Sequence, residues 1–509
     1  MTRAATLIAT VVAALVLGTA VVVAFHADRF TLRPADWSAV RFTLLQAGLS
    51  AAVSTLLAIP LARALMRRTF PGRSLLVTLM GAPFLLPVVV AVVGILSVYG
   101  RDGLFNQALA ALGLPSVSIF GLQGVVLTNV FFDLPLATRI LLNGWAAIPA
   151  ERFRLAETLG LPPSAQFRHI EAPMLRNLLP GAFTVVFLLC LTSFVVSLTL
   201  GGGPRATTLE LAIYQALRFD FDLGRAALLA AVQFGICIAV VLLAGRLTLP
   251  AGLGVGQDRA GRLPARNDWR LLVDGGLIAL VALFLALPMV SVVRDGIGHL
   301  ADLSGMVWQA ALRSVGMACV SALLATAGGL CLALAAARGG ALKRWIDVSA
   351  MLPMAASGLV LGTGLFLMLR PWTTPEAVAV PVTVLVNATL ALPFLYRLLL
   401  PEAQALRLGY DRLSDTLGLN GIARLRHVTL PRLARPLGLG GGIAAALSMG
   451  DLGVIALFAG HDSATLPLMV HRLAGAYRMD QAAAASLLLV GLSFLLFLLC
   501  DLGGRRAAP

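Results

Sequence analysis

The sequence predicts an all-α polytopic membrane protein with about twelve transmembrane helices, arranged as two parallel repeats of six. Three observations lead to this prediction. The chain is 59% hydrophobic and 12% charged, with a mean hydropathy of +0.91, whereas soluble domains average roughly a quarter charged residues. Its apolar residues are gathered into runs long enough to cross a bilayer, and one polar stretch between such runs occurs twice.

About twelve apolar runs reach the length of roughly 20 residues that spans the hydrocarbon core. The first follows Arg3 and closes with Ala-Phe-His-Ala, as a secretory signal does, but it is long for the apolar core of a signal. We therefore expect an uncleaved first helix. The runs lie near 4–24, 42–65, 75–99, 121–145, 180–200, 226–245, 271–293, 308–337, 346–369, 379–400, 437–458 and 482–501.

The basic residues predict the orientation of these spans. The net charge is +15, but the arginines and the single lysine, Lys343, cluster in short loops between apolar runs, which favours positive-inside topology over nucleic-acid binding. The orientation that fits has both termini in the cytoplasm. The loops then placed inside carry Arg67, Arg68, Arg73, Arg259, Arg262, Arg266, Arg270, Arg338, Lys343, Arg344, Arg505 and Arg506.

Two similar halves of six spans each are expected, at 1–247 and 271–509, joined by a cytoplasmic linker at 248–270 that is rich in Gly, Pro and charge. Asn129, Pro135 and Arg139 of the first half recur at a constant offset in the second, as Asn387, Pro393 and Arg397. Six spans in each half return the chain to the same side. The repeats are therefore parallel, about an axis along the membrane normal.

The stretch that occurs twice lies at 154–175 and 412–433, without a gap between the copies. Each copy has a short helical run that ends in Thr-Leu-Gly, a second polar segment, and a proline before the next span. Glycine suits the end of a helix and proline the beginning of the next. We predict a helical hairpin on the cytoplasmic face, within loops 146–178 and 402–436. The alternative is an amphipathic loop lying in the lipid headgroups.

This pattern resembles the "EAA" loop of the permeases of ATP-binding-cassette importers, which has Gly, nine residues, then Ile-x-Leu-Pro. The copies supply Gly160 and Ile170-Glu-Ala-Pro173, and Gly418 and Val428-Thr-Leu-Pro431. Both depart from the family at the Glu-Ala-Ala opening, so contacts of that glutamate are not carried over. The resemblance implies that a separate ATPase is contacted by Arg154, Ala156, Gly160, Arg168, Ile170, Pro173, Arg412, Gly418, Arg426, Val428 and Pro431.

More narrowly, residues 1–503 resemble the thiamine transport permeases, which are fused two-half members of this superfamily. The resemblance is carried by Ile95–Arg101, by Leu198–Leu217, and by Gly450–Phe458 followed by Thr465-Leu-Pro467. It implies that the chain lies in a bacterial inner membrane, with a periplasmic thiamine-binding protein and an ATPase dimer as partners. Thiamine phosphates, ferric iron or a polyamine are alternative substrates. An ion-coupled secondary transporter is a less favoured alternative, because it leaves the repeated hairpin unexplained.

The chain is not expected to be an enzyme or to hold a cofactor. A phosphate-binding loop needs Gly-x4-Gly-Lys-[Ser/Thr], and Lys343 stands in Ala-Leu-Lys-Arg. ATP and Mg²⁺ are therefore assigned to the partner ATPase. We find no catalytic or metal-binding constellation, and the five cysteines lie in apolar runs without metal spacing.

Candidate residues for the translocation pathway are Asp133 and Asp451, with Tyr99 and Tyr214. The two carboxylates fall within predicted spans, where an acidic side chain usually faces a polar cavity or a partner. Acidic and aromatic groups suit thiamine, which carries a fixed positive charge. The alternative is a hydrogen bond between helices or an ion pair with an arginine such as Arg139.

Two outer segments, 205–225 and 459–480, mix charges with aromatic residues and are candidates for docking the binding protein. Ordinary packing of loops around a gate is the alternative. The docking candidates are Arg205, Glu210, Arg218, Asp220, Asp462 and Tyr477.

Overall fold

The structure is a computed structural model that describes residues 2–27, 31–80, 86–203, 206–244, 269–419, 421–460 and 463–507. Within these ranges all regular secondary structure is helical, which confirms the all-α prediction for the described residues. Among the described residues, eleven stretches are long and apolar enough to cross a membrane, and the number rises to twelve if one bent pair of helices is taken as a single span. Residues 248–268 of the expected linker lie outside the described ranges.

The first half comprises α1 (Thr2–His26), α2 (Pro34–Arg67), α3 (Arg73–Leu79), α4 (Val88–Tyr99), α5 (Leu104–Ala111), α6 (Leu122–Ala146), α7 (Ala150–Thr158), α8 (Pro163–Gln166), η2 (Phe167–Glu171), α9 (Ala172–Leu191), α10 (Phe194–Leu200), α11 (Leu209–Arg218) and α12 (Leu223–Ala244). The second half comprises α13 (Arg270–Ile297), α14 (Gly305–Ala336), α15 (Ala341–Met351), η4 (Leu352–Ala355), α16 (Gly358–Leu369), α17 (Ala379–Thr416), α18 (Gly421–Arg424), η5 (Leu425–Thr429), α19 (Leu430–Met449), α20 (Gly453–Phe458), α21 (Leu466–Gly475) and α22 (Met479–Ala507).

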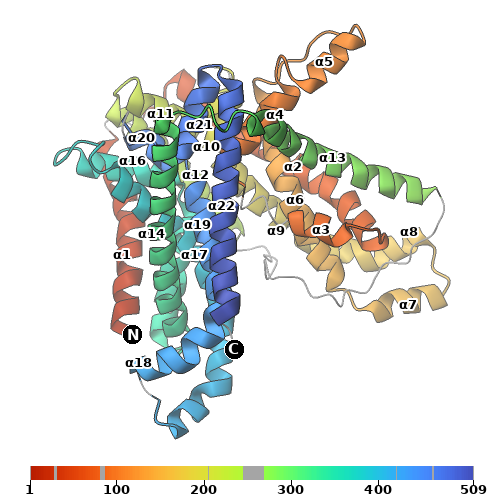
Figure 1. The fold of residues 1–509 in the computed structure, drawn as a ribbon. Coiled ribbons are helices and arrows are strands. Elements are labelled where there is room, and N and C mark those ends of the chain that lie inside the picture. The colour runs from red at the N-terminus through yellow and green to blue at the C-terminus, as the bar shows by residue number, and fades with distance from the viewer. Residues whose placement is uncertain are drawn as a thin grey trace.

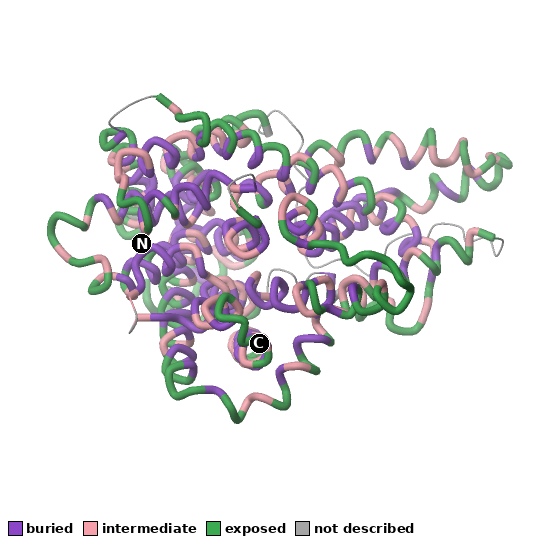
Figure 2. Tube along the Cα trace, turned by 90° about the horizontal axis from the view of Figure 1, so that it is seen from above, coloured by how far each residue is buried: buried purple, intermediate pink, exposed green. Residues whose placement is uncertain are grey.

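The duplication seen in the sequence is also a duplication of packing. In the first half α2 packs against α6 and α9, and in the second half the equivalent α14 packs against α17 and α19 (Figure 1). Seen along the bundle, the buried segments lie inside the clusters of helices and the exposed ones follow the rim and the projecting connections (Figure 2). Both termini and both copies of the repeated stretch lie in the lower part of Figure 1.

The first helix of each half packs against the other half. Helix α1 contacts α14, α15 and α16, and α13 contacts α2 and α4. Two glycines make these crossings close. A Cβ at Gly94 on α4 would lie 2.5 Å from the carbonyl oxygen of Pro288, and one at Gly364 on α16 would lie 2.4 Å from Cβ of Thr19. Both crossings therefore need glycine, because a larger side chain at Gly94 or Gly364 would clash with the facing helix.

The predicted spans near 75–99 and 346–369 carry prolines and glycines that make a kink expected, at Pro83, Pro87 and Gly94 and at Pro353 and Gly364. In the structure neither span is a continuous helix. In the second half α15 and α16 are bent by 96°, with the 3₁₀ turn η4 between them. Pro353 lies in that turn, and Ser357 caps α16 by accepting a hydrogen bond from the Val360 N–H at 3.2 Å. Proline lacks the N–H that would continue the helix, and the cap begins a new one. In the first half α3 ends at Leu79 and α4 begins after Pro87.

Candidate functional site

Both copies of the repeated stretch form the same helical hairpin. In the first copy α7 ends at Thr158 and is followed by Gly160, whose φ is +64°, and in the second α17 ends at Thr416 and is followed by Gly418, whose φ is +65°. The N–H of Leu161 donates to the carbonyl of Ala156, and that of Leu419 donates to the carbonyl of Ser414, both at 2.9 Å. This is the Schellman helix end, in which a left-handed residue reverses the chain. Glycine is needed at these two positions, because a residue with a Cβ rarely adopts a positive φ.

The returning arm of each hairpin contains a π turn. The N–H of Ala172 donates to the carbonyl of Phe167, and that of Leu430 donates to the carbonyl of Leu425, five residues earlier in each case. Prolines at 173 and 431 explain the wider turn, because they have no N–H to offer the carbonyl four residues back. Arg168, His169, Arg426 and His427 lie on these turns and are exposed.

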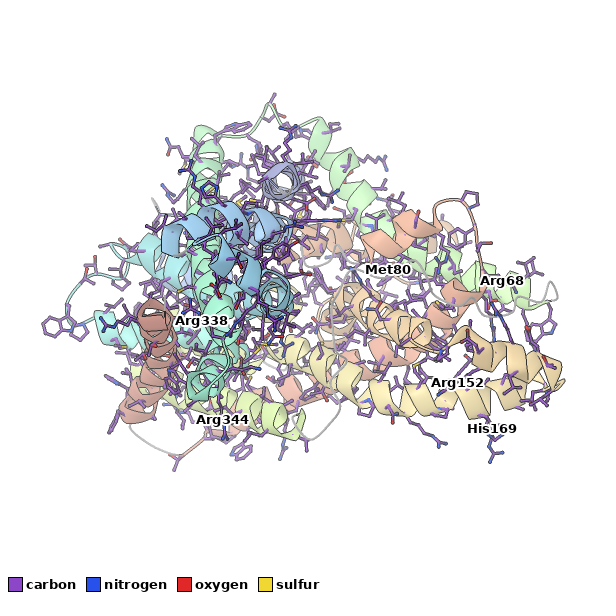
Figure 3. All side chains as sticks on the ribbon, turned by 90° about the horizontal axis from the view of Figure 1, so that it is seen from below. Arg68, Met80, Arg152, His169, Arg338 and Arg344 are labelled. Atoms are coloured by element: carbon purple, nitrogen blue, oxygen red, sulfur yellow. The ribbon has the colours of Figure 1, made fainter. Side chains whose placement is uncertain are left out.

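The coupling candidates fall into the same burial pattern in the two copies. Arg154, Gly160 and Arg168 are exposed, as are Arg412, Gly418 and Arg426. Ala156 is buried, Ile170 and Val428 are half-buried, and Pro173 is exposed while Pro431 is half-buried. Seen from below, the labelled basic residues of the first half, Arg68, Arg152 and His169, and those of the second, Arg338 and Arg344, share one face (Figure 3).

Sequence reasoning missed four exposed leucines on the outgoing arms. Leu155 and Leu159 are 60% and 65% exposed, and their counterparts Leu413 and Leu417 are 53% and 63% exposed. Their recurrence at the offset of the repeat was a signal in the sequence. Exposed apolar side chains on a polar hairpin, at matching places in two copies, are typical of a surface that a protein partner covers. We call these four residues the hairpin leucines.

Glu171 is a second residue that sequence reasoning missed. It is buried at the end of η2, where Arg63 of α2 donates to its two carboxylate oxygens at 2.7 and 2.8 Å. Trp145 of α6 donates from Nε1 to Oε2 at 3.0 Å, and the Arg63 guanidinium lies 4.8 Å from the centre of the Phe167 ring. Glu171 therefore ties the first hairpin to two helices of the bundle by charge-assisted bonds.

The second hairpin is held by other residues. Thr429 occupies the position of Glu171, so the same network cannot form. Instead Asp411 accepts hydrogen bonds from Arg407, at 3.1 Å, and from Arg424. Arg407 also donates to the carbonyl of Ala337 at 2.9 Å. The two hairpins share a backbone shape but differ in the side chains that fix them.

The four pathway candidates do not come together. Asp133 lies inside the first half, where its Oδ2 accepts a hydrogen bond from the Cys190 thiol at 2.9 Å. The Tyr99 ring lies 5.7 Å from that of Phe105 and lines an apolar groove of about 860 Å³ between α2, α4, α6 and α13. A pathway role for these two stays a prediction. Asp451 and Tyr214, by contrast, lie in one region between the halves.

That region is built from α10 and α11 of the first half and α16 and α20 of the second. The Phe194 ring lies 5.4 Å from that of Tyr214, and its Cδ1 lies 3.8 Å from where a Cβ at Gly453 would be. The Oδ1 of Asp451 lies 3.8 Å from the same point. Side chains of both halves share one core cluster here.

Glu210 was expected on an exposed docking loop, but its side chain points inward in this region. It is 2% exposed, because α11 is oriented by a hydrogen bond from the Leu209 N–H to Thr43 Oγ1 at 2.8 Å. Its carboxyl group faces Ser357 and the backbone of Phe194. Burial raises the pKa of Glu210 to about 7, because desolvation outweighs these donors.

The other docking candidates are placed as follows. Arg218 donates to the carbonyl of Ala459 in the second half at 3.2 Å, and Asp220 pairs with Arg225 at 3.1 Å. Tyr477 is 93% exposed and has a φ of +59°, a strained conformation for a residue other than glycine. Arg205 and Asp462 lie outside the described residues.

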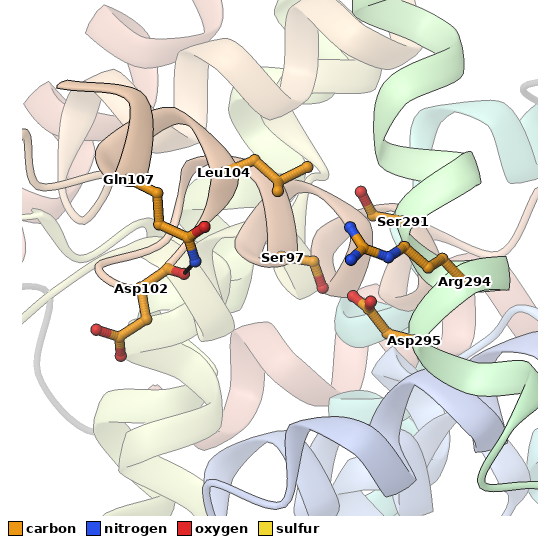
Figure 4. A pocket seen from close by; sticks show the side chains of 7 residues that line it. All are labelled: Ser97, Asp102, Leu104, Gln107, Ser291, Arg294 and Asp295. Atoms are coloured by element: carbon orange, nitrogen blue, oxygen red, sulfur yellow. Dashed lines mark hydrogen bonds between the residues drawn. The ribbon is translucent and has the colours of Figure 1, made fainter. Parts of the chain in front are cut away.

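A polar cavity of about 220 Å³ lies between the two halves, near the start of α5 (Figure 4). Arg294 and Asp295 reach it from α13, and Asp102 and Gln107 reach it from the first half. Gln107 donates to the backbone carbonyl of Asp102 at 2.8 Å, which fixes the turn before α5.

Comparison with known proteins gives one consistent result. Residues 329–508 match the family described as binding-protein-dependent transport system inner membrane component. The chain is 40% identical over 456 residues to a thiamine transport system permease protein of Brucella abortus, covering 87% of this chain and 83% of the relative. It is also 40% identical to the proteins of that name in Salmonella typhimurium and Escherichia coli, in each case over 88% of this chain and 86% of the relative.

Proposed function

The chain belongs to the family of thiamine transport system permeases, inner membrane components of binding-protein-dependent transport systems, and from this premise we propose that it forms the membrane pathway of an ATP-driven thiamine importer. The observation that carries the proposal is the pair of matching hairpins, with the same Schellman end, the same π turn and the same exposed leucines. Two equivalent docking elements suit a dimeric partner with two equivalent grooves.

The energy source in this proposal is a separate ATPase dimer, which binds ATP and Mg²⁺ and receives one hairpin in each subunit. The chain's only lysine, Lys343, does not stand in a phosphate-binding loop. The arginines that share the hairpin face favour a cytoplasmic location for this face and for both termini. The binding protein then docks at the opposite end, where Asp220 and Tyr477 are exposed.

Uptake measurements test the proposal. The chain is reconstituted in liposomes with its ATPase and binding protein, and radiolabelled thiamine uptake is followed. We expect uptake that requires ATP and that excess unlabelled thiamine suppresses but ferric iron or a polyamine does not. Suppression by one of these instead would contradict the assignment of thiamine. Uptake driven by an ion gradient without the ATPase would contradict the transporter class.

Crosslinking tests the docking of the hairpins. In a chain whose five native cysteines are replaced, Thr158→Cys and Thr416→Cys should each crosslink to a cysteine placed in the cleft of the ATPase, because both threonines are exposed on the outgoing arms. Ser118→Cys, exposed before α6, is the matched control and should give no crosslink. A functional complex without crosslinks from either hairpin would refute this docking.

A further inference from the structure

Resting on the proposed function, we propose that Glu210 and Asp451, together with the rings of Phe194 and Tyr214, form a cation site between the two halves through which the positively charged ring of thiamine passes. The site lies beside α10, α11 and α20, at the end of the bundle away from both hairpins (Figure 1). It takes one carboxyl group from each half.

Both carboxyl groups have an oxygen that is buried and has no hydrogen-bond partner. In Glu210 this atom is Oε1, and in Asp451 it is Oδ2. Within the described residues neither group forms an ion pair. A buried polar atom without a partner is unfavourable, and proteins retain such atoms mainly where function needs them. A cation held between the carboxylates would supply the missing partner to both.

The backbone around Asp451 presents its carboxyl group to the interface. Asp451 lies at the break between α19 and α20, where its Oδ1 accepts a hydrogen bond from the Gly453 N–H at 3.2 Å. Asn387 lies beside it and donates to Ser448 Oγ at 3.1 Å. The break thus fixes Oδ1, and the carboxyl group also faces the Asn387 side chain and the backbone of Val454 and Ile455.

Phe194 lies beside both carboxyl groups and so relates them to each other. Glu210 faces the backbone of Phe194, and the Phe194 ring approaches Gly453 and thereby Asp451. Phe194 and Tyr214 meet at an interplanar angle of 61°, which offers ring faces in two directions. Cations bind to such faces, and the flat rings of thiamine can stack on them.

The repeat itself indicates that Glu210 serves the substrate rather than the fold. Thr208-Leu209-Glu210-Leu211 aligns with Thr465-Leu466-Pro467-Leu468 in the second half. Leu466 repeats the anchoring of Leu209, because its N–H donates to Ser314 Oγ at 2.8 Å just as that of Leu209 donates to Thr43. The second half therefore builds the same element with proline in place of the acid. The carboxyl group is not needed to form this helix.

The test is uptake of radiolabelled thiamine by the complete transporter in liposomes, with its ATPase and binding protein. Glu210→Gln and Asp451→Asn should each lower the maximal uptake rate by about tenfold or more, because the negative charge is lost. Glu210→Asp keeps the charge and should retain more activity than Glu210→Gln. Glu376→Gln makes the same chemical change at an exposed position before α17 and should stay within about twofold of the wild type.

Wild-type rates in Glu210→Gln and Asp451→Asn, at normal abundance in the liposomes, would overturn the cation site alone. Equal loss in Glu210→Asp and Glu210→Gln would also overturn it, because shape and not charge would then be required. A wild-type complex that carries no thiamine would overturn the proposed function and the site with it. Thiamine uptake by the wild-type complex therefore distinguishes a failure of the cation site from a failure of the proposed function.

Discussion

Replacing Glu171 with alanine is expected to abolish most ATP-driven uptake and to destabilise the chain by about 3–5 kcal/mol, the usual cost of leaving one member of a buried ion pair unpaired. Arg63 would lose both of its bonds to the carboxylate, and Trp145 would lose its acceptor. The first hairpin would then lose its charged link to α2 and α6 and be held to them by apolar packing alone. Thermal unfolding of the detergent-solubilised chain and uptake in liposomes measure the two effects.

Thr429→Ala is the matched control, since Thr429 occupies the equivalent position of the second hairpin and is also buried. We expect it to change stability by less than about 1 kcal/mol. Glu171→Gln should be intermediate, because its amide oxygen can still accept one of these bonds. Wild-type stability and uptake in Glu171→Ala would show that the network does not hold the hairpin.

Replacing Leu159 and Leu417 together with aspartate is expected to separate the chain from its ATPase without unfolding it. Each side chain is more than half exposed, so the bundle loses little by the change. Burying one leucine in a partner contributes about 1.5–3 kcal/mol, so each substitution should weaken binding by about 10- to 100-fold. Copurification of the ATPase and uptake should both fall sharply.

Leu112→Asp is the control for this experiment, because Leu112 is 74% exposed at the end of α5, away from both hairpins. It should leave copurification of the ATPase unchanged. Full ATPase binding by the double leucine variant would assign these side chains to lipid contact. A drop in thermal stability of the isolated chain would contradict their exposure.

Much of this architecture could be predicted because it follows from local composition. Apolar runs give the spans, and the duplicated Gly-x9-[Ile/Val]-x-x-Pro frame gives both hairpins, including the glycines with positive φ. Prolines marked both broken spans as sites of a kink, but whether a proline bends a helix or ends it depends on the neighbouring helices. Gly94 and Gly364 were visible in the sequence, but the helices that cross at them were not.

The side-chain networks were harder to predict for a physical reason. Arg63 and Glu171 are 108 residues apart in the chain, and only the packing of α2 beside η2 brings them together. Glu210 was misplaced because its burial depends on α11 packing against α16 and α20 of the other half, and the rotation of α11 is set by Thr43 on another helix. Tertiary contacts decided both positions.

The exchange of first helices has a consequence for the order of assembly. A ribosome delivers α1 to the membrane at the start of synthesis, yet α14, α15 and α16, against which it packs, follow only after residue 304. Until α16 has been made, Gly364 is absent, and Thr19 on α1 has no helix to pack against at this crossing. Helix α12 of the first half covers one side of α1, but the side that faces α14, α15 and α16 is covered only when the second half has been inserted.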